Sequence, residues 1–386
     1  MKFVMYQDCV SPHQIPLACE LAKCLGAENF RYVYRDKVQS GRANLGWVMD
    51  SKNSWAIHLG TQCEYATDLI ENAECLLTMF RDVNLMTRRH ARGLKTLVQT
   101  ERWFKPRIGI ARLLSTSYRR MAKEFVRLLM KGGVIYLPMG IHAARDMARL
   151  CGLLAGDLKC LFRAPKLEFE RKPLGRIWHG SEFVDKRYCS DKMMMWGYFV
   201  ESTKSPVQPI GMDAGKRQKV VRVLWVGRFL GWKRVDTIIK AVGECADMKR
   251  KDDLVPLVTL DLYGTGPEEH CLRNTAKRYA DVIKFHPPVM IDEVRQLMRS
   301  HNVYVLASNG YEGWGAVVNE ALEEGMKVIG TYEAGSSATM LSDACLFRTG
   351  DWLSLSRMFL DVAPVSVEAV WTPELAVEAL LGLLRT

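Results

Sequence analysis

Short apolar runs alternate with amphipathic segments along the chain, a pattern typical of parallel sheets covered by helices. The apolar run at residues 2–6 predicts a buried strand, and apolar residues at helical spacing then continue to Gly26. Further strands are expected over residues 30–34, 75–80, 94–99 and 134–137, and a further helix over residues 143–153.

Residues 201–218 interrupt this alternation with two prolines, two glycines and few large apolar side chains, which predicts a linker. After the linker, strands are expected over 220–226, 258–263, 282–285, 303–307 and 327–331, with helices over 235–245, 268–279, 291–300 and 316–324. We therefore expect two successive α/β domains, 1–200 and 219–386. The final helix, 373–384, could pack on either of them.

The composition argues against a disordered, a fibrous, a disulfide-stabilised and a membrane-spanning protein. With 386 residues, 48% hydrophobic and 25% charged, the chain is long and apolar enough to build large cores. Its eleven cysteines form no C-x-x-C pair, which favours reduced thiols over a zinc ribbon or a disulfide framework. No signal peptide and no apolar run of membrane-spanning length is visible, so a cytoplasmic protein is expected.

Three clusters follow predicted strands, where open α/β sheets bind ligands. In the first, Arg228 and Lys233 lie five residues apart after strand 220–226. Such a pair suits a pyrophosphate-sized anion, although both could equally be solvated loop cations. The second cluster, Y-G-T-G-P around Gly264, allows a close backbone approach or simply makes a tight turn.

The third cluster joins strand 303–307 to the next helix. Gly313 and Gly315 permit a sharp turn there, and the free N–H groups at the helix start favour an anion. Glu312 lies in this loop and Glu320 in the helix, so two carboxylates are available to one ligand. Either one could alone be a cap or a surface residue.

The third cluster, E-G-W-G-A-V-V-N-E-A-L, resembles the E-x7-E signature of retaining glycosyltransferases of family four. G-R-F-L-G-W-K-R-V-D and Y-G-T-G-P resemble the two preceding motifs of that family, in the expected order. The resemblance covers about residues 220–360 and is weaker over 1–200. It implies the GT-B fold, in which two Rossmann-like α/β/α domains face a cleft.

The resemblance implies a role for each matching position. Arg228 and Lys233 would bind the diphosphate of a UDP- or GDP-sugar, and the N–H groups of Gly315, Ala316 and Val317 would hold its distal phosphate. Glu320 would accept hydrogen bonds from the ribose. Glu312 would face the transferred sugar, as would His142 of the first domain, although a lone histidine is often structural. Gly264 and Gly313 would lie against the donor.

The sequence departs from the family pattern in two places. Arg234 stands where the family has glycine, and residues 8–14 replace a glycine-rich loop, which puts acceptor contacts there in doubt. No D-x-D pair is present, so no metal ligands are evident and no cofactor is expected. A metal-independent hexosyltransferase is the activity implied.

The excess of positive over negative charge lies in the first half of the chain. Residues 1–200 hold 32 Lys and Arg against 19 Asp and Glu, whereas the remaining 186 hold 22 against 24. Apolar residues from Ile110 to Leu128 recur at helical spacing, which predicts one apolar stripe. The cations expected on the opposite face are Arg112, Arg119, Arg120, Lys123 and Arg127.

This basic face could be merely solvated, or it could bind an anionic partner. An acidic membrane surface or a lipid-linked acceptor is the preferred partner, at the inner face of the plasma membrane. Nucleic acid is disfavoured because no recognisable motif accompanies the charge.

The function expected is transfer of a sugar to a cell-surface glycan. The alternatives are a GT-B-like sugar-nucleotide epimerase or phosphorylase, and a basic nucleic-acid-binding α/β protein.

Overall fold

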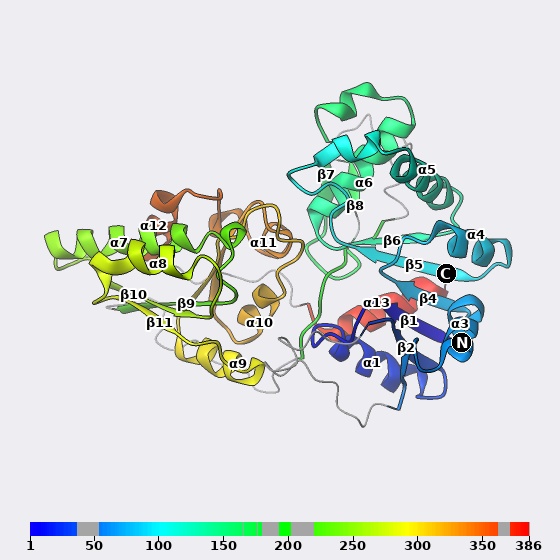
Figure 1. Cartoon of the computed structure of the whole chain (residues 1–386), viewed down its shortest axis with the longest axis horizontal. Helices are drawn as coiled ribbons and strands as arrows, with labels where there is room; N and C mark the ends of the chain where they lie inside the picture. Colours follow the sequence, from blue (N-terminus) through cyan, green and yellow to red (C-terminus); the bar gives the residue numbers. More distant parts are fainter. Residues whose placement is uncertain are drawn as a thin grey trace. The chain divides into compact units, whose positions relative to one another are not determined.

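The computed structural model describes residues 1–36, 54–164, 166–175, 177–179, 193–201, 220–361 and 371–385. The chain forms two compact units (Figure 1). Unit 1 comprises Met1–Glu201 together with Trp371–Thr386, and unit 2 comprises Ser202–Val370. The expected linker lies outside the described residues apart from Glu201.

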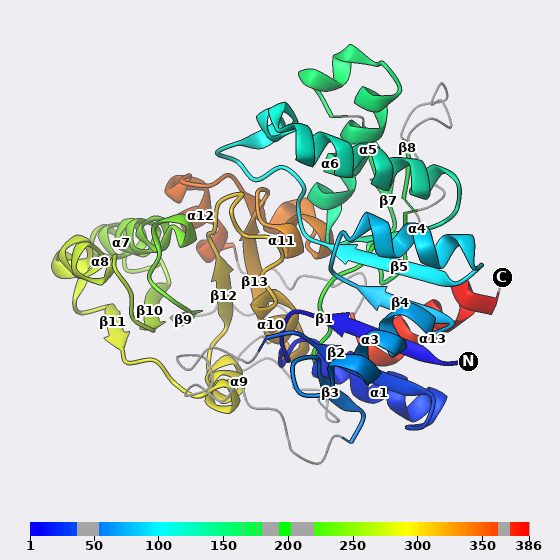
Figure 2. The same ribbon diagram turned by 45° about the vertical axis from the view of Figure 1, so that its right-hand side comes forward.

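Unit 1 is built on a six-stranded parallel sheet with the order β3-β2-β1-β4-β5-β6. Figure 2 shows β5, β4, β1 and β2 side by side in this sheet. Its strands are β1 (Phe3–Gln7), β2 (Phe30–Tyr34), β3 (Ala56–His58), β4 (Cys75–Thr78), β5 (Lys95–Thr100) and β6 (Ile135–Pro138). The sequence pattern did not indicate β3, which has only three residues.

Helices cover both faces of this sheet. The helices α3 (Cys63–Asn72) and α4 (Val83–Ala91) bury Ile70 and Leu85 against strand residues such as Val4 and Val33. The helix α1 (Ile15–Leu25) packs against β2 and against the last helix, α13 (Pro373–Arg385). Lys95 Nζ donates to the Leu384 carbonyl at 2.5 Å, which ties the end of α13 to β5. Among the described residues, unit 1 also contains the α-helices α5 (Thr116–Met130) and α6 (Ile141–Leu154).

One buried arginine joins these elements. Arg89 of α4 is fully buried, and its guanidinium donates to the carbonyls of Ile70, Glu71, Ala73 and Lys95 and to the Thr96 hydroxyl. Burial lowers the pKa of Arg89 to about 10. Because these carbonyls include the last ones of α3, Arg89 supplies the partners that a helix C-terminus lacks.

Unit 2 repeats the design with the order β11-β10-β9-β12-β13-β14, and all its paired strands are parallel. The strands are β9 (Val220–Val226), β10 (Leu257–Tyr263), β11 (Ile283–His286), β12 (Val303–Leu306), β13 (Lys327–Thr331) and β14 (Leu346–Phe347). The helices are α7 (Val235–Lys251), α8 (Glu269–Ala276), α9 (Ile291–Ser300), α10 (Val317–Glu323), α11 (Gly335–Met340) and α12 (Trp352–Leu360).

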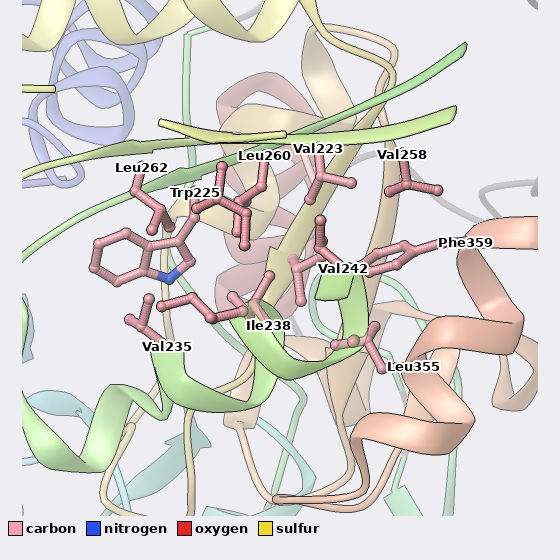
Figure 3. Packing of buried hydrophobic residues seen from close by; sticks show 14 of the residues in the cluster. Val223, Trp225, Val235, Ile238, Val242, Val258, Leu260, Leu262, Leu355 and Phe359 are labelled. Atoms are coloured by element: carbon pink, nitrogen blue, oxygen red, sulfur yellow. The ribbon is translucent and has the colours of Figure 1, made fainter. Parts of the chain in front are cut away.

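The core of unit 2 lies between the sheet and α7, α8 and α12. Figure 3 shows Trp225 and Leu260 of the strands packed against Ile238 of α7, with Leu355 and Phe359 of α12 close by. Alternate strand residues point to the other face, where α9 and α10 pack.

The predicted α/β architecture with two domains is confirmed. A short antiparallel pair, β7 (Leu167–Phe169) with β8 (Ile177–His179), was not predicted. Among the described residues, no helix combines the length and the apolar character needed to cross a membrane.

Candidate functional site

The candidate site lies at the carboxyl edge of the second sheet, where the strand order reverses. The chain moves outward from β9 to β10 and β11, then returns to place β12 on the other side of β9. The loops after β9 and β12 therefore leave the same edge from neighbouring strands. Ligands of open α/β sheets bind at such a reversal.

Backbone hydrogen bonds fasten the loops at this edge to one another. Asn309 N, after β12, donates to Trp232 O, after β9, at 2.9 Å. Phe229 N donates to Thr265 O, after β10, at 3.0 Å. Three loops that are distant in sequence thus form one backbone framework, which holds the side chains they carry in fixed positions.

Gly264 fits this framework because it has no side chain. A Cβ at Gly264 would lie 1.8 Å from the Gly227 carbonyl oxygen, and its φ of +151° is rare for other residues. Gly227 N also donates to Tyr263 O at 3.0 Å. Close backbone packing is therefore reason enough for glycine at 264, whether or not a donor also contacts it.

An ion pair occupies the centre of the site. Lys233 Nζ contacts Glu312 Oε2, with side-chain exposures of only 19% and 11%. Ser308 Oγ donates to the same Glu312 oxygen at 2.9 Å, and Lys233 Nζ lies 4.4 Å from the centre of the Trp232 ring. The structure thus brings together two residues that the sequence placed in separate motifs. Because both side chains are largely shielded from water, each charge is compensated by the other.

The start of α10 supplies donors to the same site. Gly315 has φ +92°, and Ala316 caps the helix without a side-chain hydrogen bond. The N–H groups of Gly315, Ala316 and Val317 donate to no described residue. Consecutive unpaired N–H groups at a helix start attract an anion.

Neighbouring side chains hold this turn in place. Ser336 Oγ donates to the Gly315 carbonyl at 3.0 Å, and Ser336 N donates to the Trp314 carbonyl at 2.9 Å. Trp314 is fully buried and its indole N–H donates to Asn319 Oδ1 at 2.8 Å. Gly313 lies in the same turn, and its carbonyl approaches Gly335 so closely that a Cβ there would lie 2.1 Å away.

The other two predicted donor residues lie on the same loops. Arg228 is exposed in the loop after β9, and its guanidinium has no hydrogen-bond or ion-pair partner among the described residues. Glu320 is half-buried in the first turn of α10. Together with Lys233, Glu312 and the N–H groups, these residues belong to a single edge of unit 2.

Arg234, the departure from the family pattern, has a left-handed backbone. Its φ is +50° and its ψ +41°, a conformation in which glycine is free of strain. Its guanidinium donates to both carboxylate oxygens of Asp236, at 2.9 and 3.1 Å. Burial raises the pKa of Asp236, but these hydrogen bonds and the charge of Arg234 outweigh it and hold that pKa below its usual value. A position that favours glycine is thus occupied by an arginine that forms a bidentate ion pair.

His142 is the second residue of α6 in unit 1, after Gly140 with φ +86°. It is half-buried. It belongs to a different unit from Glu312, and its sugar-facing role stays a prediction.

The apolar stripe predicted from Ile110 to Leu128 does not lie along one helix. A 3-10 turn, η1 (Gly109–Leu114), ends at Ser115, whose side chain caps α5 by accepting from Tyr118 N. Leu114, expected in the apolar stripe, is 80% exposed. Arg112 lies on η1, with its guanidinium 4.3 Å from the centre of the Tyr118 ring. It is therefore not on the same helix face as the other cations.

Four of the five cations do share a face of α5. Arg119, Arg120, Lys123 and Arg127 are exposed and lie within about 100° of arc, given 3.6 residues per turn. Arg127 is partly offset by an ion pair with Glu124. The buried side of α5 comprises Tyr118, Ala122, Phe125, Val126, Leu128 and Leu129.

Sequence reasoning gave no role to Ser308 or Ser336, which orient Glu312 and the turn before α10. Ser308 directly follows the apolar run that ends at Ala307, and this switch from apolar to polar was an available signal. Ser336 offered none, because its partner is 21 residues away. Within the described residues, no group of three or more His, Cys, Asp or Glu side chains is arranged to hold a metal ion.

Residues 220–362, which include all elements from β9 to α12, match the family model described as "Glycosyl transferases group 1". A curated relative is the GtfA subunit of the UDP-N-acetylglucosamine–peptide N-acetylglucosaminyltransferase of Streptococcus pneumoniae. The match is 28% identical over 133 residues, 34% of this chain and 24% of that protein.

Several solved structures share the fold over the whole chain. HepE of Anabaena, in complex with UDP and glucose, aligns with a TM-score of 0.57 at 12% identity, covering 100% of both chains. The lipopolysaccharide outer core galactosyltransferase WaaB aligns at 0.59 and 11% identity, covering 99% of this chain and 100% of that chain. A glycosyltransferase from Rickettsia africae aligns at 0.58 and 14%, covering 99% and 97%. The fold is thus that of GT-B glycosyltransferases.

Proposed function

We propose that the chain is a retaining glycosyltransferase of family four, which moves a hexosyl group from a nucleotide-diphosphate donor to a glycan or lipid-linked acceptor. Its setting would be the synthesis of a cell-surface polysaccharide. The observation that carries the proposal is the arrangement after β9 and β12. There Lys233 contacts Glu312, and the turn after Glu312 leads directly to the three unpaired N–H groups.

The donor would lie along the edge from β10 to α10. Lys233 and Arg228 would bind the diphosphate, and the N–H groups of Gly315, Ala316 and Val317 would hold its distal phosphate. Glu320 would accept hydrogen bonds from the ribose hydroxyls. UDP is the first nucleotide to test as the carrier of the sugar, because HepE was solved with UDP and the GtfA relative is named for a UDP-sugar.

The ion pair gives Lys233 and Glu312 connected roles. A diphosphate that binds Lys233 would weaken the ion pair between Lys233 and Glu312. Glu312 Oε2 would still accept the hydrogen bond from Ser308. Glu312 would then orient the transferred sugar and stabilise positive charge on its ring. His142 would contact the same sugar from unit 1.

In the transfer step, the acceptor hydroxyl attacks the anomeric carbon on the face that the diphosphate leaves. The bond between the anomeric carbon and the donor phosphate oxygen breaks, and the hydroxyl proton passes to that oxygen. Because attack and departure occur on the same face, the anomeric configuration is retained. Lys233, Arg228 and the N–H groups offset the charge that develops on the departing diphosphate. Each such donor is typically worth about 10²–10³ in rate. On this account the reaction needs no metal ion.

A thermal-shift screen against UDP-, GDP- and ADP-sugars, with and without added Mg²⁺ or EDTA, tests donor binding. A ligand that binds only the folded state raises the melting temperature. We expect one nucleotide class to stabilise the protein equally in Mg²⁺ and in EDTA. Stabilisation by none of the three would contradict the proposal, and NMR of the product's anomeric proton tests retention.

Substitutions in the site provide a second test. Lys233→Ala and Glu320→Ala should each lower kcat/KM by at least about 10²-fold, because each removes a contact to the leaving group or its ribose. Lys251→Ala, at an exposed lysine at the end of α7, is the matched control and should leave kcat/KM unchanged. Normal transfer by both site variants would overturn the assignment.

The exposed cations of α5 would place the enzyme at an acidic membrane surface, where a lipid-linked acceptor is available. Arg119, Arg120, Lys123 and Arg127 present their charge on one side of the helix. Replacing Arg119, Arg120 and Lys123 by glutamine should reduce sedimentation with acidic vesicles at low salt. Binding to neutral vesicles should be weak for both forms.

A further inference from the structure

The turn that follows α6 in unit 1 exposes three large apolar side chains. It is a 3-10 turn, η2 (Leu158–Leu161), and lies among the green segments at the top of Figures 1 and 2. Leu158 is 68% exposed, Leu161 41% and Phe162 89%. Residues three apart eclipse each other in a 3-10 helix, so Leu158 and Leu161 share one side.

The turn is firmly attached to α6. Arg149 of α6 donates from Nε to the Cys160 carbonyl at 2.5 Å and from Nη2 to the Leu161 carbonyl. Cys160 is only 3% exposed and points inward, opposite to its apolar neighbours. Asp157 Oδ1 accepts from Lys159 N at 3.0 Å at the start of the turn. The exposure of the apolar side chains is thus fixed by the fold.

Cations flank this apolar tip. Lys159 and Arg163 are exposed on either side of Leu161 and Phe162, and Lys166 follows. Residues 154–166 contain these three cations and a single acid, Asp157, whose carboxylate is engaged by the backbone. An apolar tip among cations is typical of segments that lie in the boundary between lipid headgroups and acyl chains.

We propose that Leu158, Leu161 and Phe162 insert into the interfacial layer of an anionic lipid bilayer, with Lys159 and Arg163 at the headgroup level. This inference rests on the proposed function, because insertion into a bilayer would bring the enzyme to a membrane-bound acceptor. It assigns apolar insertion to η2, whereas the cations of α5 supply attraction over a longer range. Salt screens the attraction but not the insertion, so the two contributions are separable.

Vesicle sedimentation separates them. We would compare the wild type, Leu158→Ser/Phe162→Ser, and Arg119→Gln/Arg120→Gln/Lys123→Gln on vesicles of phosphatidylcholine alone or mixed with phosphatidylglycerol. On acidic vesicles the serine variant should partition at least about tenfold less at high salt as well as low, because apolar burial does not depend on salt. The glutamine variant should lose binding mainly at low salt. Leu254→Ser is the matched control, since Leu254 is 77% exposed but lies in unit 2.

A depth measurement gives a readout that a folding defect cannot imitate. Phe162→Trp should gain fluorescence quenching by brominated lipids relative to the wild type, and Leu254→Trp should not. Absence of extra quenching at Phe162→Trp, or wild-type binding by the serine variant, would overturn the inference. A shift from dimer to monomer in the serine variant, without loss of vesicle binding, would identify a second copy as the partner instead. Donor-induced thermal shifts are measured without lipid, so they report on the transferase proposal separately.

Discussion

Gly264 and Gly227 show how single residues set the backbone of the site. A side chain at 264 would meet a carbonyl oxygen at 1.8 Å, and backbone cannot move aside as a flexible side chain can. We expect Gly264→Ala to lower the free energy of unfolding by about 1–3 kcal/mol, as overpacking typically does. Urea denaturation measures the change.

The matched control for Gly264 lies in α13. An added Cβ at Gly382 meets nothing within 4 Å, and this residue is inside a helix. Gly382→Ala should therefore raise the free energy of unfolding, by about 0.5–1 kcal/mol. Opposite signs for the two alanine variants are expected. A neutral Gly264→Ala would show that the loops after β9 and β10 can separate at little cost.

Arg234 combines an unfavourable backbone with a favourable ion pair. A non-glycine residue in the left-handed region costs about 1–2 kcal/mol, whereas its half-exposed ion pair with Asp236 contributes less. Both Arg234→Ala and Arg234→Gly remove the ion pair, but only glycine relieves the strain. We expect the glycine variant to be more stable than the alanine variant by about 1 kcal/mol in thermal or urea denaturation. Equal stabilities would mean that the left-handed backbone is not strained.

At the scale of whole elements, the sequence predicts the bounds of a strand or helix best where its apolar pattern runs without interruption from one end to the other. The strands at 30–34 and 220–226 and the helix at 291–300 have the predicted bounds, because their patterns end at clear polar or glycine boundaries. One apolar stripe was predicted across 110–128 because its helical spacing passes through Ser115 without a break. A serine that caps a helix looks, in a periodicity count, like any polar residue.

The centre of the site was less predictable than its loops. The motifs predicted that Lys233 and Glu312 lie at the carboxyl edge of the second sheet, but not their contact, which joins residues 79 apart in sequence. Only the strand order, with β12 returning beside β9, brings them together. A single sequence contains no direct signal of which motifs will touch.

Three elements of unit 2 meet at Asp261, and the contact predicts a pH dependence. Asp261 Oδ2 lies 3.3 Å from His301 Nε2, after α9, and Oδ1 lies 2.6 Å from His286 Nε2 on β11. The hydrogen bond from His301, with that from His286, outweighs burial and lowers the pKa of Asp261. Its contribution to stability is thus complete above the unfolded-state pKa of about 3.9, and is lost as pH falls through the lower folded-state value.

Asp261→Asn should therefore be less stable than the wild type at neutral pH, and the difference should shrink as pH falls below about 4. Urea midpoints measured across that range test this. Asp253→Asn is the control, because its side chain is fully exposed and the substitution should change stability little at any pH. A difference between wild type and Asp261→Asn that is independent of pH would contradict the assignment of the effect to titration of Asp261.

At the scale of the molecule, the chain crosses from unit 1 to unit 2 and then returns. The last helix, α13, belongs to unit 1, where it packs on α1 and its Leu384 carbonyl accepts from Lys95. Trp371, at the start of this return, is 2% exposed and stacks on Phe199 with ring centres 6.2 Å apart. The C-terminal segment is thus part of the core of unit 1, although it follows unit 2 in sequence.

Deleting residues 371–386 should accordingly destabilise unit 1 and spare unit 2. Several buried apolar side chains are lost with α13 (Ala376, Val377, Leu380 and Leu384), and the side of α1 that they cover becomes exposed. We expect calorimetry to show two separate transitions, with only one moved to lower temperature. The nucleotide-sugar that stabilises the full chain should still raise the unmoved transition, since Lys233, Glu312 and the start of α10 all lie in unit 2. A deletion that leaves both transitions in place, or that abolishes the nucleotide-dependent shift, would contradict this division of the molecule.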